Sequence, residues 1–312
     1  MELDLGPLRS RLTFSADEAR SLDLGREALR ELTTKGVIRR LSRGWYTARP
    51  IGTPEEEHRL RVAAVVRGFG EGVAASHHSM LLLVGLPVVR ADLDTVFLTR
   101  TDTAHGRSGP GVHVVRKAGS VEAHSPEDGT APIPHVDPAT AIVQAGLRAG
   151  LDTAVVAADA ALRAKMCTRL QIDDALDAHS RCRGHASLRP LATRIDPRRE
   201  SPGESLCAGV MTRAGYAFTP QVEIRCGIEL YRVDFLLDAL PVIVEFDGMA
   251  KYGDDLRNLR EEKRREDNLR ALGYEIVRLT WTDLFAPERF LQRLAAAVAR
   301  ATARRAPFDA PA

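Results

Sequence analysis

Three carboxylates, Asp234, Glu245 and Asp247, would share one face of a short stretch that alternates in the manner of a β-hairpin. Residues 231–248 read Tyr-Arg-Val-Asp-Phe-Leu-Leu-Asp-Ala-Leu-Pro-Val-Ile-Val-Glu-Phe-Asp-Gly. In a two-strand register this sequence sets Asp234 opposite Glu245 and Arg232 opposite Asp247. Like charges opposed at about 5 Å destabilise a sheet, so a cation is expected beside them.

A divalent metal ion is the cation that suits these acids best. Mg²⁺, or Mn²⁺ in its place, prefers one or two carboxylates with waters and substrate phosphates, and Asp234 and Glu245 would be its ligands. In the alternative, Arg232 neutralises part of the cluster and water solvates the rest. If an arginine or lysine already fills the gap, the enzymatic hypothesis loses its basis and a docking role remains.

The same alternation predicts a single apolar face on the hairpin. Its members would be Val233, Phe235, Leu237, Val242, Val244 and Phe246. This register needs a turn at Ala239-Leu240. Neither residue readily takes a positive φ, so a one-residue slip is the alternative register.

A further acid stands at the start of a helix that precedes the hairpin. Ser201-Pro202-Gly203-Glu204 has Ser at the cap, Pro at the first helical position and Glu three residues after the cap. This pattern is that of a capping box, which needs no function. A third carboxylate directed at the metal is equally compatible with it.

The composition predicts a protein of several domains with ordinary cores. The chain has 312 residues, a net charge of +2 and 44% hydrophobic residues. Its four cysteines form no CxxC pair, which indicates reduced thiols rather than a zinc site or a disulfide framework. Without a secretion signal or a long apolar run, we expect a cytoplasmic protein with no membrane segment.

Residues 15–47 have the pattern of a helix-turn-helix followed by a wing. A short helix begins at Ser15, a second lies between Gly25 and Gly36, and two strand-like segments flank the turn 42–44. The second helix would read the DNA groove, and the wing would add cations. The residues predicted to contact DNA are Arg26, Arg30, Thr33, Arg39, Arg40 and Arg43. A solvated amphipathic helix in a small bundle is the alternative.

The segment Leu32–Tyr46, read as Leu-Thr-Thr-Lys-Gly-Val-Ile-Arg-Arg-Leu-Ser-Arg-Gly-Trp-Tyr, resembles the amino-terminal domain of AbiEi-type antitoxin proteins. The resemblance covers roughly residues 1–50. It implies a winged helix that binds promoter DNA and represses its own operon. It leaves open whether a cognate toxin or a second copy of the chain is a protein partner.

The middle of the chain predicts an α+β domain. Its expected elements are a helix from Pro54, a helix over 74–84, strands over 94–99 and 112–116, helical segments over 138–179 and a basic stretch over 181–199. His77 and His78 would point about 100° apart on a helix and could not share one metal ion, so a cap or a core contact is favoured. Dimerisation, ligand sensing and spacing of the two ends are all open roles.

The last part of the chain predicts a helix, strands, a helix and a strand. The expected elements are a helix over 201–214, a strand over 222–225, the acidic hairpin, a helix over 255–272, a strand over 274–280 and a helix from Pro287. This order, with an Asp and then a Glu-x-Asp on adjacent strands, resembles the PD-(D/E)XK nuclease fold. The closer similarity, over about 200–284, is to very-short-patch-repair-like endonucleases. It is carried by Tyr231–Phe235, Val244–Gly248, Glu262–Arg270 and Leu272–Trp281.

This resemblance implies roles for individual residues. Asp234 and Glu245 would hold the metal, and Glu204 would be the helix acid. Asp247 stands where the wider fold has a lysine that orients or activates the attacking water. Lys251 could fold back and supply that cation, which completes the expected catalytic set. Lys263 is the alternative, although it stands on a helix full of charges where a solvated face is favoured.

The sequence therefore predicts an α/β multidomain protein. Residues 1–51 would form a winged helix-turn-helix, 52–198 the α+β middle domain, and 199–312 a restriction-endonuclease-like α/β domain with a mixed central sheet. One function is a Mg²⁺- or Mn²⁺-dependent endonuclease acting on double-stranded DNA. The alternative is an antitoxin-type repressor whose nuclease-fold domain is inactive. An RNA-processing factor is a weaker third, since the sequence has no aromatic stacking platform.

Overall fold

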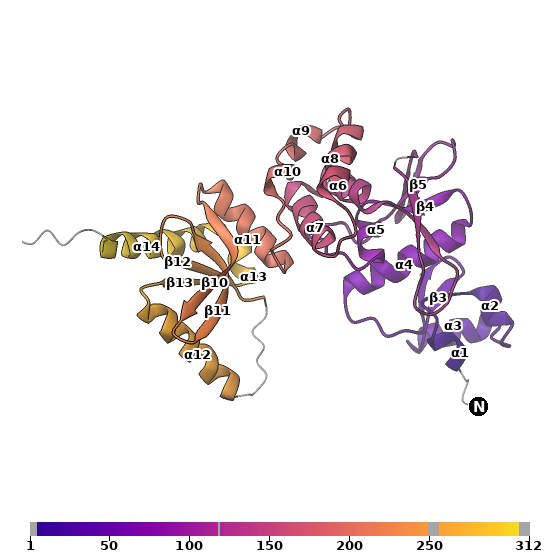
Figure 1. Cartoon of the computed structure of the whole chain (residues 1–312). Helices are drawn as coiled ribbons and strands as arrows, with labels where there is room; N and C mark the ends of the chain where they lie inside the picture. Colours follow the sequence, from indigo (N-terminus) through magenta and orange to yellow (C-terminus); the bar gives the residue numbers. More distant parts are fainter. Residues whose placement is uncertain (1–4, 118, 249–255, 306–312) are drawn as a thin grey trace, which may run out of the picture. The chain divides into compact units, whose positions relative to one another are not determined.

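The computed structural model describes residues 5–117, 119–248 and 256–305, with side chains in the helix that begins at Leu256 described from Arg260 to Ala271. Contacts divide the chain into two compact units, Met1–Ile195 and Asp196–Ala312, and both are mixed α/β (Figure 1). The predicted domains 1–51 and 52–198 both fall in the first unit, except for residues 196–198, which belong to the second.

The first part of unit 1 combines short helices with a small antiparallel sheet. Its elements are α1 (Gly6–Arg9), β1 (Phe14–Ser15), α2 (Ala16–Arg20), α3 (Arg26–Thr34), β2 (Arg39–Ser42) and β3 (Trp45–Thr47), with the strands in the order β1-β3-β2. A capping box between Ser15 and Glu18 starts α2, because each side chain accepts the other's backbone N–H. The predicted helix start, the second helix and the two flanking strands are confirmed.

A separate apolar cluster holds these elements together. Leu29 and Leu32 of α3 are buried in it beside Phe14 of β1. The Phe14 ring stacks on Tyr46 of β3, with 5.9 Å between ring centroids. The position of α3 is therefore fixed by the strands β1 and β3.

The rest of unit 1 surrounds a mixed sheet in the order β6-β7-β5-β4-β9-β8. Its elements are α4 (Pro54–Phe69), β4 (Val73–Ala75), α5 (His77–Leu83), β5 (Val96–Arg100), β6 (Arg107–Gly109), β7 (Val112–Val115), β8 (Val121–His124) and β9 (Ile133–Val136). The expected start of α4 is confirmed, with Thr53 and Glu56 forming a capping box.

The helix expected over 74–84 is wrong at its start. Residues 73–75 are instead the strand β4, which pairs antiparallel with β5 and parallel with β9. A short apolar run buried on both faces gives no periodicity that separates a strand from a helix. The strands β6, β8 and β9 were not predicted, and each has only three or four residues.

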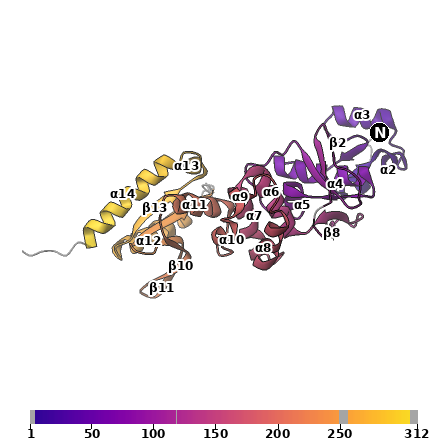
Figure 2. The ribbon, with the colours of Figure 1, turned by 90° about the horizontal axis from the view of Figure 1, so that it is seen from above.

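Helices complete unit 1 beyond the sheet. They are α6 (Pro138–Ala149), α7 (Leu151–Arg163), α8 (Arg169–Ala178), α9 (His185–Leu188) and α10 (Leu191–Arg194). The helical segments expected over 138–179 are confirmed, while the basic stretch contains two short helices. Within unit 1, α8–α10 lie at the opposite end from α1–α3 (Figures 1 and 2).

Unit 2 is a mixed sheet with helices on both faces. Its elements are α11 (Pro202–Arg213), β10 (Phe218–Cys226), β11 (Glu229–Leu237), β12 (Val242–Phe246), α12 (Leu256–Ala271), β13 (Glu275–Leu279), α13 (Trp281–Phe285) and α14 (Pro287–Arg305). The strand order is β10-β11-β12-β13, antiparallel except for the parallel pair β12–β13. Residues of α11, α13 and α14 pack on one face and Leu269 of α12 on the other (Figure 1).

Across the ranges that the structure describes, no helix is both long and apolar enough to span a bilayer.

Candidate functional site: a carboxylate cluster and a basic helix face

The predicted register of the acidic hairpin is confirmed. Phe235 of β11 pairs with Val244 of β12, and Leu236 pairs with Ile243. One further step along this register sets Asp234 opposite Glu245. The ladder ends there, because Asp234 Oδ2 accepts the backbone N–H of Phe246 at 2.8 Å.

The prediction of one apolar face on the hairpin is wrong for Val233. Phe235 and Val244 join the core under α11 and α14, as expected. Val233 instead packs with Ile243 in the cluster under α12. Strict alternation fails at Asp234, where the two strands separate. Both faces of the hairpin are therefore buried, and Asp234 and Glu245 lie at the edge of a core rather than on an open surface.

Glu245 has an internal counter-ion. Its Oε1 lies 2.5 Å from Nη2 of Arg265 in α12, and its Oε2 lies 3.8 Å from Nε of Arg278 in β13. The Arg265 guanidinium also donates to the carbonyl of Arg232 at 2.9 Å. Only 14% of the Glu245 side chain and 25% of the Arg265 side chain are exposed, so water screens this pair weakly.

Arg232 does not neutralise the cluster. Its guanidinium pairs with Glu200 at 2.9 Å instead. Asp247 is exposed, and its backbone N–H donates to the carbonyl of Leu279 at 2.6 Å. Lys251 lies outside the described residues.

Glu204 is buried at the start of α11 and serves as more than a cap. Ser201 Oγ accepts the Glu204 N–H at 3.1 Å, as the capping pattern predicts. The Glu204 carboxylate, however, accepts the N–H of Glu200 at 2.8 Å and the Nε2–H of Gln221 at 3.0 Å. Gln221 belongs to β10 and has a φ of +55°, so an irregular point of the edge strand faces the helix acid.

Asp234 responds to its burial and to the charged groups around it. The pKa of Asp234 is raised to about 6, chiefly by burial and also by the charges of Glu204 and Glu245. The Phe246 N–H and Arg265 act in the opposite direction. Burial also raises the pKa of the neighbouring Cys207 thiol, with Asp234 and Glu204 contributing. The structure therefore brings Glu204 and Glu245 close to Asp234, whereas Asp247, the fourth acid of the predicted site, is exposed.

This arrangement does not fit a divalent metal ion. A hard cation needs several free oxygen ligands. Here one oxygen of Asp234 accepts a hydrogen bond from a backbone N–H, and one oxygen of Glu204 accepts hydrogen bonds from two donors. Glu245 forms an ion pair with a guanidinium. Within the described part of the chain, no three His, Cys, Asp or Glu side chains are placed to hold a metal.

Sequence reasoning missed Arg265 as a member of this site. The available signal was helical spacing, because Arg265 precedes the buried Leu269 by four residues and so lies on the same face of α12. It was hidden among neighbouring charges such as Arg264, which is exposed and pairs with Glu229.

The residues predicted to contact DNA form a second candidate site on α3 and the β2–β3 turn. Arg26 and Arg30 are exposed one turn apart on α3, and Arg43 is exposed in the turn. These three arginines form no ion pair with a carboxylate among the residues that the structure describes. Their charges are thus available to an external anion.

The other three residues of that set are engaged to different degrees. Thr33 is half-buried and donates its hydroxyl to the Leu29 carbonyl at 2.7 Å. Arg39 pairs with Glu57 of α4 at 2.9 Å. Arg40 is exposed and donates from Nε to the Ser42 carbonyl at 3.3 Å.

The histidines of the middle segment are core residues, as expected. His77 and His78 are buried, and both rings lie against Phe97. The side chain of His58 in α4 lies in the same core, where its Nε2 is 2.8 Å from Ser79 Oγ. Burial lowers the pKa of His77 to about 3 and that of His58 to about 4, so these rings are neutral near pH 7.

The chain is similar to known proteins over only part of its length. No family model matches the chain. Two curated proteins of Mycobacterium tuberculosis are similar to part of it: the uncharacterized protein MT2308 of strain CDC 1551 / Oshkosh and the uncharacterized protein Rv2248 of strain ATCC 25618 / H37Rv. Each is 31% identical over 166 residues, which is 52% of this chain. The chain spans 59% of the length of these relatives.

Proposed function

We propose that this protein binds duplex DNA through a winged-helix module made of α1–α3 and β1–β3, and that it acts as a DNA-binding regulator of the antitoxin type. The observation that carries the proposal is the set of exposed arginines on α3 and the β2–β3 turn that lack a carboxylate partner among the described residues. Such cations are suited to the phosphates of a DNA groove.

The local order of elements supports α3 as the reading helix. α2 and α3 are joined by a tight turn in which Asp23 has a φ of +60°. Leu29 and Leu32 fix the inner side of α3, which leaves Arg26 and Arg30 on its outer side. The β2–β3 turn, with Gly44 at a φ of +76°, would form the wing that carries Arg43.

The test is binding of a labelled duplex taken from the region upstream of the protein's own gene, followed by fluorescence anisotropy. Arg30→Ala should weaken binding by about tenfold, since one phosphate contact is removed. Arg90→Ala is the matched control, because Arg90 is 59% exposed and pairs with Asp152 in the middle part of unit 1. Equal DNA affinities of the two variants would rule out α3 as the helix that contacts DNA.

A metal-dependent endonuclease is the second candidate, and the convergence of Glu204, Asp234 and Glu245 favours it. The mixed sheet of unit 2 is compatible with the PD-(D/E)XK resemblance. The pairing of Glu245 with Arg265 makes the regulator the better supported of the two functions.

Cleavage of a supercoiled plasmid with Mg²⁺ or Mn²⁺ tests the second candidate. A nuclease would nick the plasmid, and both Asp234→Ala and Glu245→Ala would lose that activity. Intact duplex, single-stranded and mismatched DNA after incubation with either metal would instead leave unit 2 with a docking role.

A further inference from the structure

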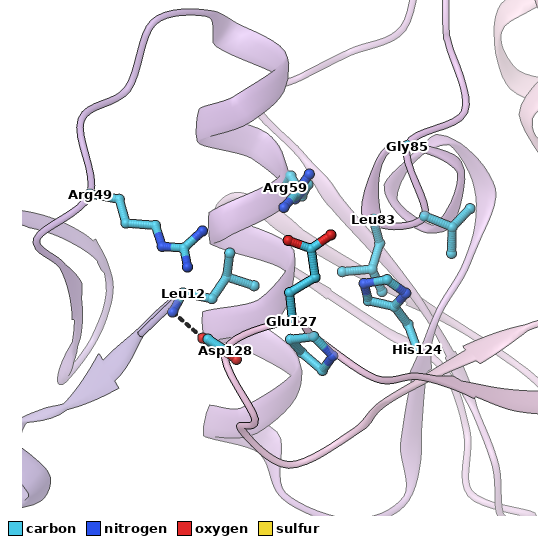
Figure 3. Close-up of a pocket in the computed structure, with 10 residues that line it drawn as sticks. Leu12, Arg49, Arg59, Leu83, Gly85, His124, Glu127 and Asp128 are labelled. Carbon is cyan, nitrogen blue, oxygen red and sulfur yellow. Dashed lines mark hydrogen bonds between the residues drawn. The ribbon is translucent and has the colours of Figure 1, made fainter. Parts of the chain in front are cut away.

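We propose that a cavity in unit 1 binds a small organic carboxylate that also carries an amino or hydroxyl group, and that its occupant acts as an effector of DNA binding. The cavity has a volume of about 180 Å³. Leu12 and Arg49 line it from the two ends of the β1–β3 part, while Arg59 of α4, Leu83 of α5 and the loop after β8 line it from the middle part (Figure 3).

The cavity has an apolar side and a polar side, because half of the residues that line it are charged or histidine. Leu12 and Leu83 are 4% and 1% exposed, and Pro126 is buried. The volume lies below the roughly 300 to 1,000 Å³ of pockets for drug-sized ligands, so the occupant is a smaller molecule. Polar groups that converge beside apolar surface fix the orientation of a small molecule.

Two guanidinium groups supply the positive charge. Arg49 donates one bond, to the Ser10 carbonyl at 2.9 Å, and neither Arg49 nor Arg59 pairs with a carboxylate among the residues that the structure covers. His124 adds a ring whose pKa is lowered by burial, by His135 and by Arg59, so it enters as a neutral donor or acceptor. A carboxylate matches the planar fork of a guanidinium.

The two acids at the cavity have different roles. Asp128 accepts the Leu12 N–H and the Thr130 N–H and hydroxyl, and Arg67 lies close enough to lower its pKa. Its charge is therefore already compensated by the protein. Glu127 is exposed and remains as an acceptor for an amino or hydroxyl group of the same ligand (Figure 3).

The cavity is connected to the strands that support α3. Thr47 of β3 donates its hydroxyl to the Leu12 carbonyl at 3.0 Å and accepts the Arg49 N–H at 3.1 Å. The strand β3 then contacts Phe14 through Tyr46, and Phe14 belongs to the cluster that buries Leu29 and Leu32. A ligand that touches Leu12 and Arg49 therefore acts on the support of the reading helix. This coupling rests on the proposed function, and it must be reciprocal between ligand and DNA.

The experiment measures ligand binding to the full-length protein without DNA. The panel contains the twenty L-amino acids, lactate, malate, citrate and inorganic phosphate, and binding is read by thermal shift and then by calorimetry. At least one amino or hydroxy acid should bind, and Arg59→Met and Arg49→Met should each weaken it at least tenfold. Arg90→Met should leave it unchanged. Binding of phosphate alone, no binding at all, or full binding by Arg59→Met would overturn the proposed site.

A second measurement separates this site from the DNA proposal. The best ligand is added to the anisotropy assay, and the DNA affinity should change at least threefold in wild type and not in Arg59→Met. Ligand binding with an unchanged DNA affinity would contradict the effector role while leaving the site intact. If the wild-type protein binds no DNA either with or without the ligand, that result contradicts the DNA-binding function instead.

Discussion

At the scale of single residues, the contact between Arg265 and Glu245 decides how the acidic hairpin is neutralised. Arg265→Met leaves Glu245 with little solvent and only the longer contact to Arg278, so unit 2 should lose about 2 kcal/mol of stability. Urea denaturation measures the loss. Adding Glu245→Gln to that variant should recover most of it, because the buried charge is then removed.

The neighbouring Arg264 provides the control for this prediction. Arg264→Met removes the same charge from the same helix, but the side chain of Arg264 is 71% exposed. Exposed pairs contribute roughly 0 to 1 kcal/mol. Equal losses in the two variants would show that Arg265 is an ordinary surface charge.

Asp234 gives unit 2 a distinctive pH dependence. Its pKa is about 6 in the folded protein and is near the ordinary value of about 4 when unfolded. The folded state therefore binds more protons between these values, so stability is fully present below pH 4 and falls as the pH rises through 6. Asp234→Asn should match wild type near pH 4 and be about 2 kcal/mol more stable at pH 7 in metal-free buffer. A less stable variant at pH 7 would contradict the account.

At the scale of elements, α11 packs against β12 so closely that one position tolerates only glycine. A Cβ on Gly203 would lie 2.0 Å from Cε1 of Phe246, whose ring is held edge-on by Trp281. Gly203→Ala should therefore cost more than about 2 kcal/mol by overpacking. Calorimetric melting measures the effect, and the double variant with Phe246→Ala should recover part of it. An unperturbed melt would show that α11 is free to shift.

Sequence patterns predicted the elements better than they predicted the contacts between them. The hairpin register followed from period-two alternation, and α2, α4 and α11 begin at the cap residues that the sequence marks. The partner of Glu245 was missed because it comes from a helix distant in sequence, and α12 carries charge on almost every turn. The face of Val233 was missed because the two strands separate at Asp234.

At the scale of the whole molecule, the two units should respond to acid in opposite directions. His58 and His77 of unit 1 are neutral when folded, with pKa values of about 4 and about 3. Below pH 6.5 the unfolded chain binds protons that the folded unit does not, so unit 1 should lose roughly 2 kcal/mol per histidine by pH 5. Unit 2 should gain about 1 kcal/mol over the same range as Asp234 becomes protonated.

Hydrogen exchange read by mass spectrometry reports both units in the same sample. Amides of β4 and β5 should exchange faster at pH 5 than at pH 7, after correction for the intrinsic rate, and amides of β11 and β12 should exchange more slowly. A change of the same sign in both sheets would contradict this assignment of buried groups.

The salt dependence of DNA binding tests the central claim most directly. Each phosphate contact releases counterions, so the logarithm of the affinity falls linearly with the logarithm of the salt concentration. If Arg26 and Arg30 contact phosphates, the Arg26→Ala/Arg30→Ala double variant should reduce the slope by about two units relative to wild type. The double variant Arg90→Ala/Arg163→Ala removes two exposed arginines from the middle part of unit 1, away from α3, and should leave the slope unchanged. An unaltered slope in the α3 variant, with DNA binding retained, would show that another surface of the protein binds DNA.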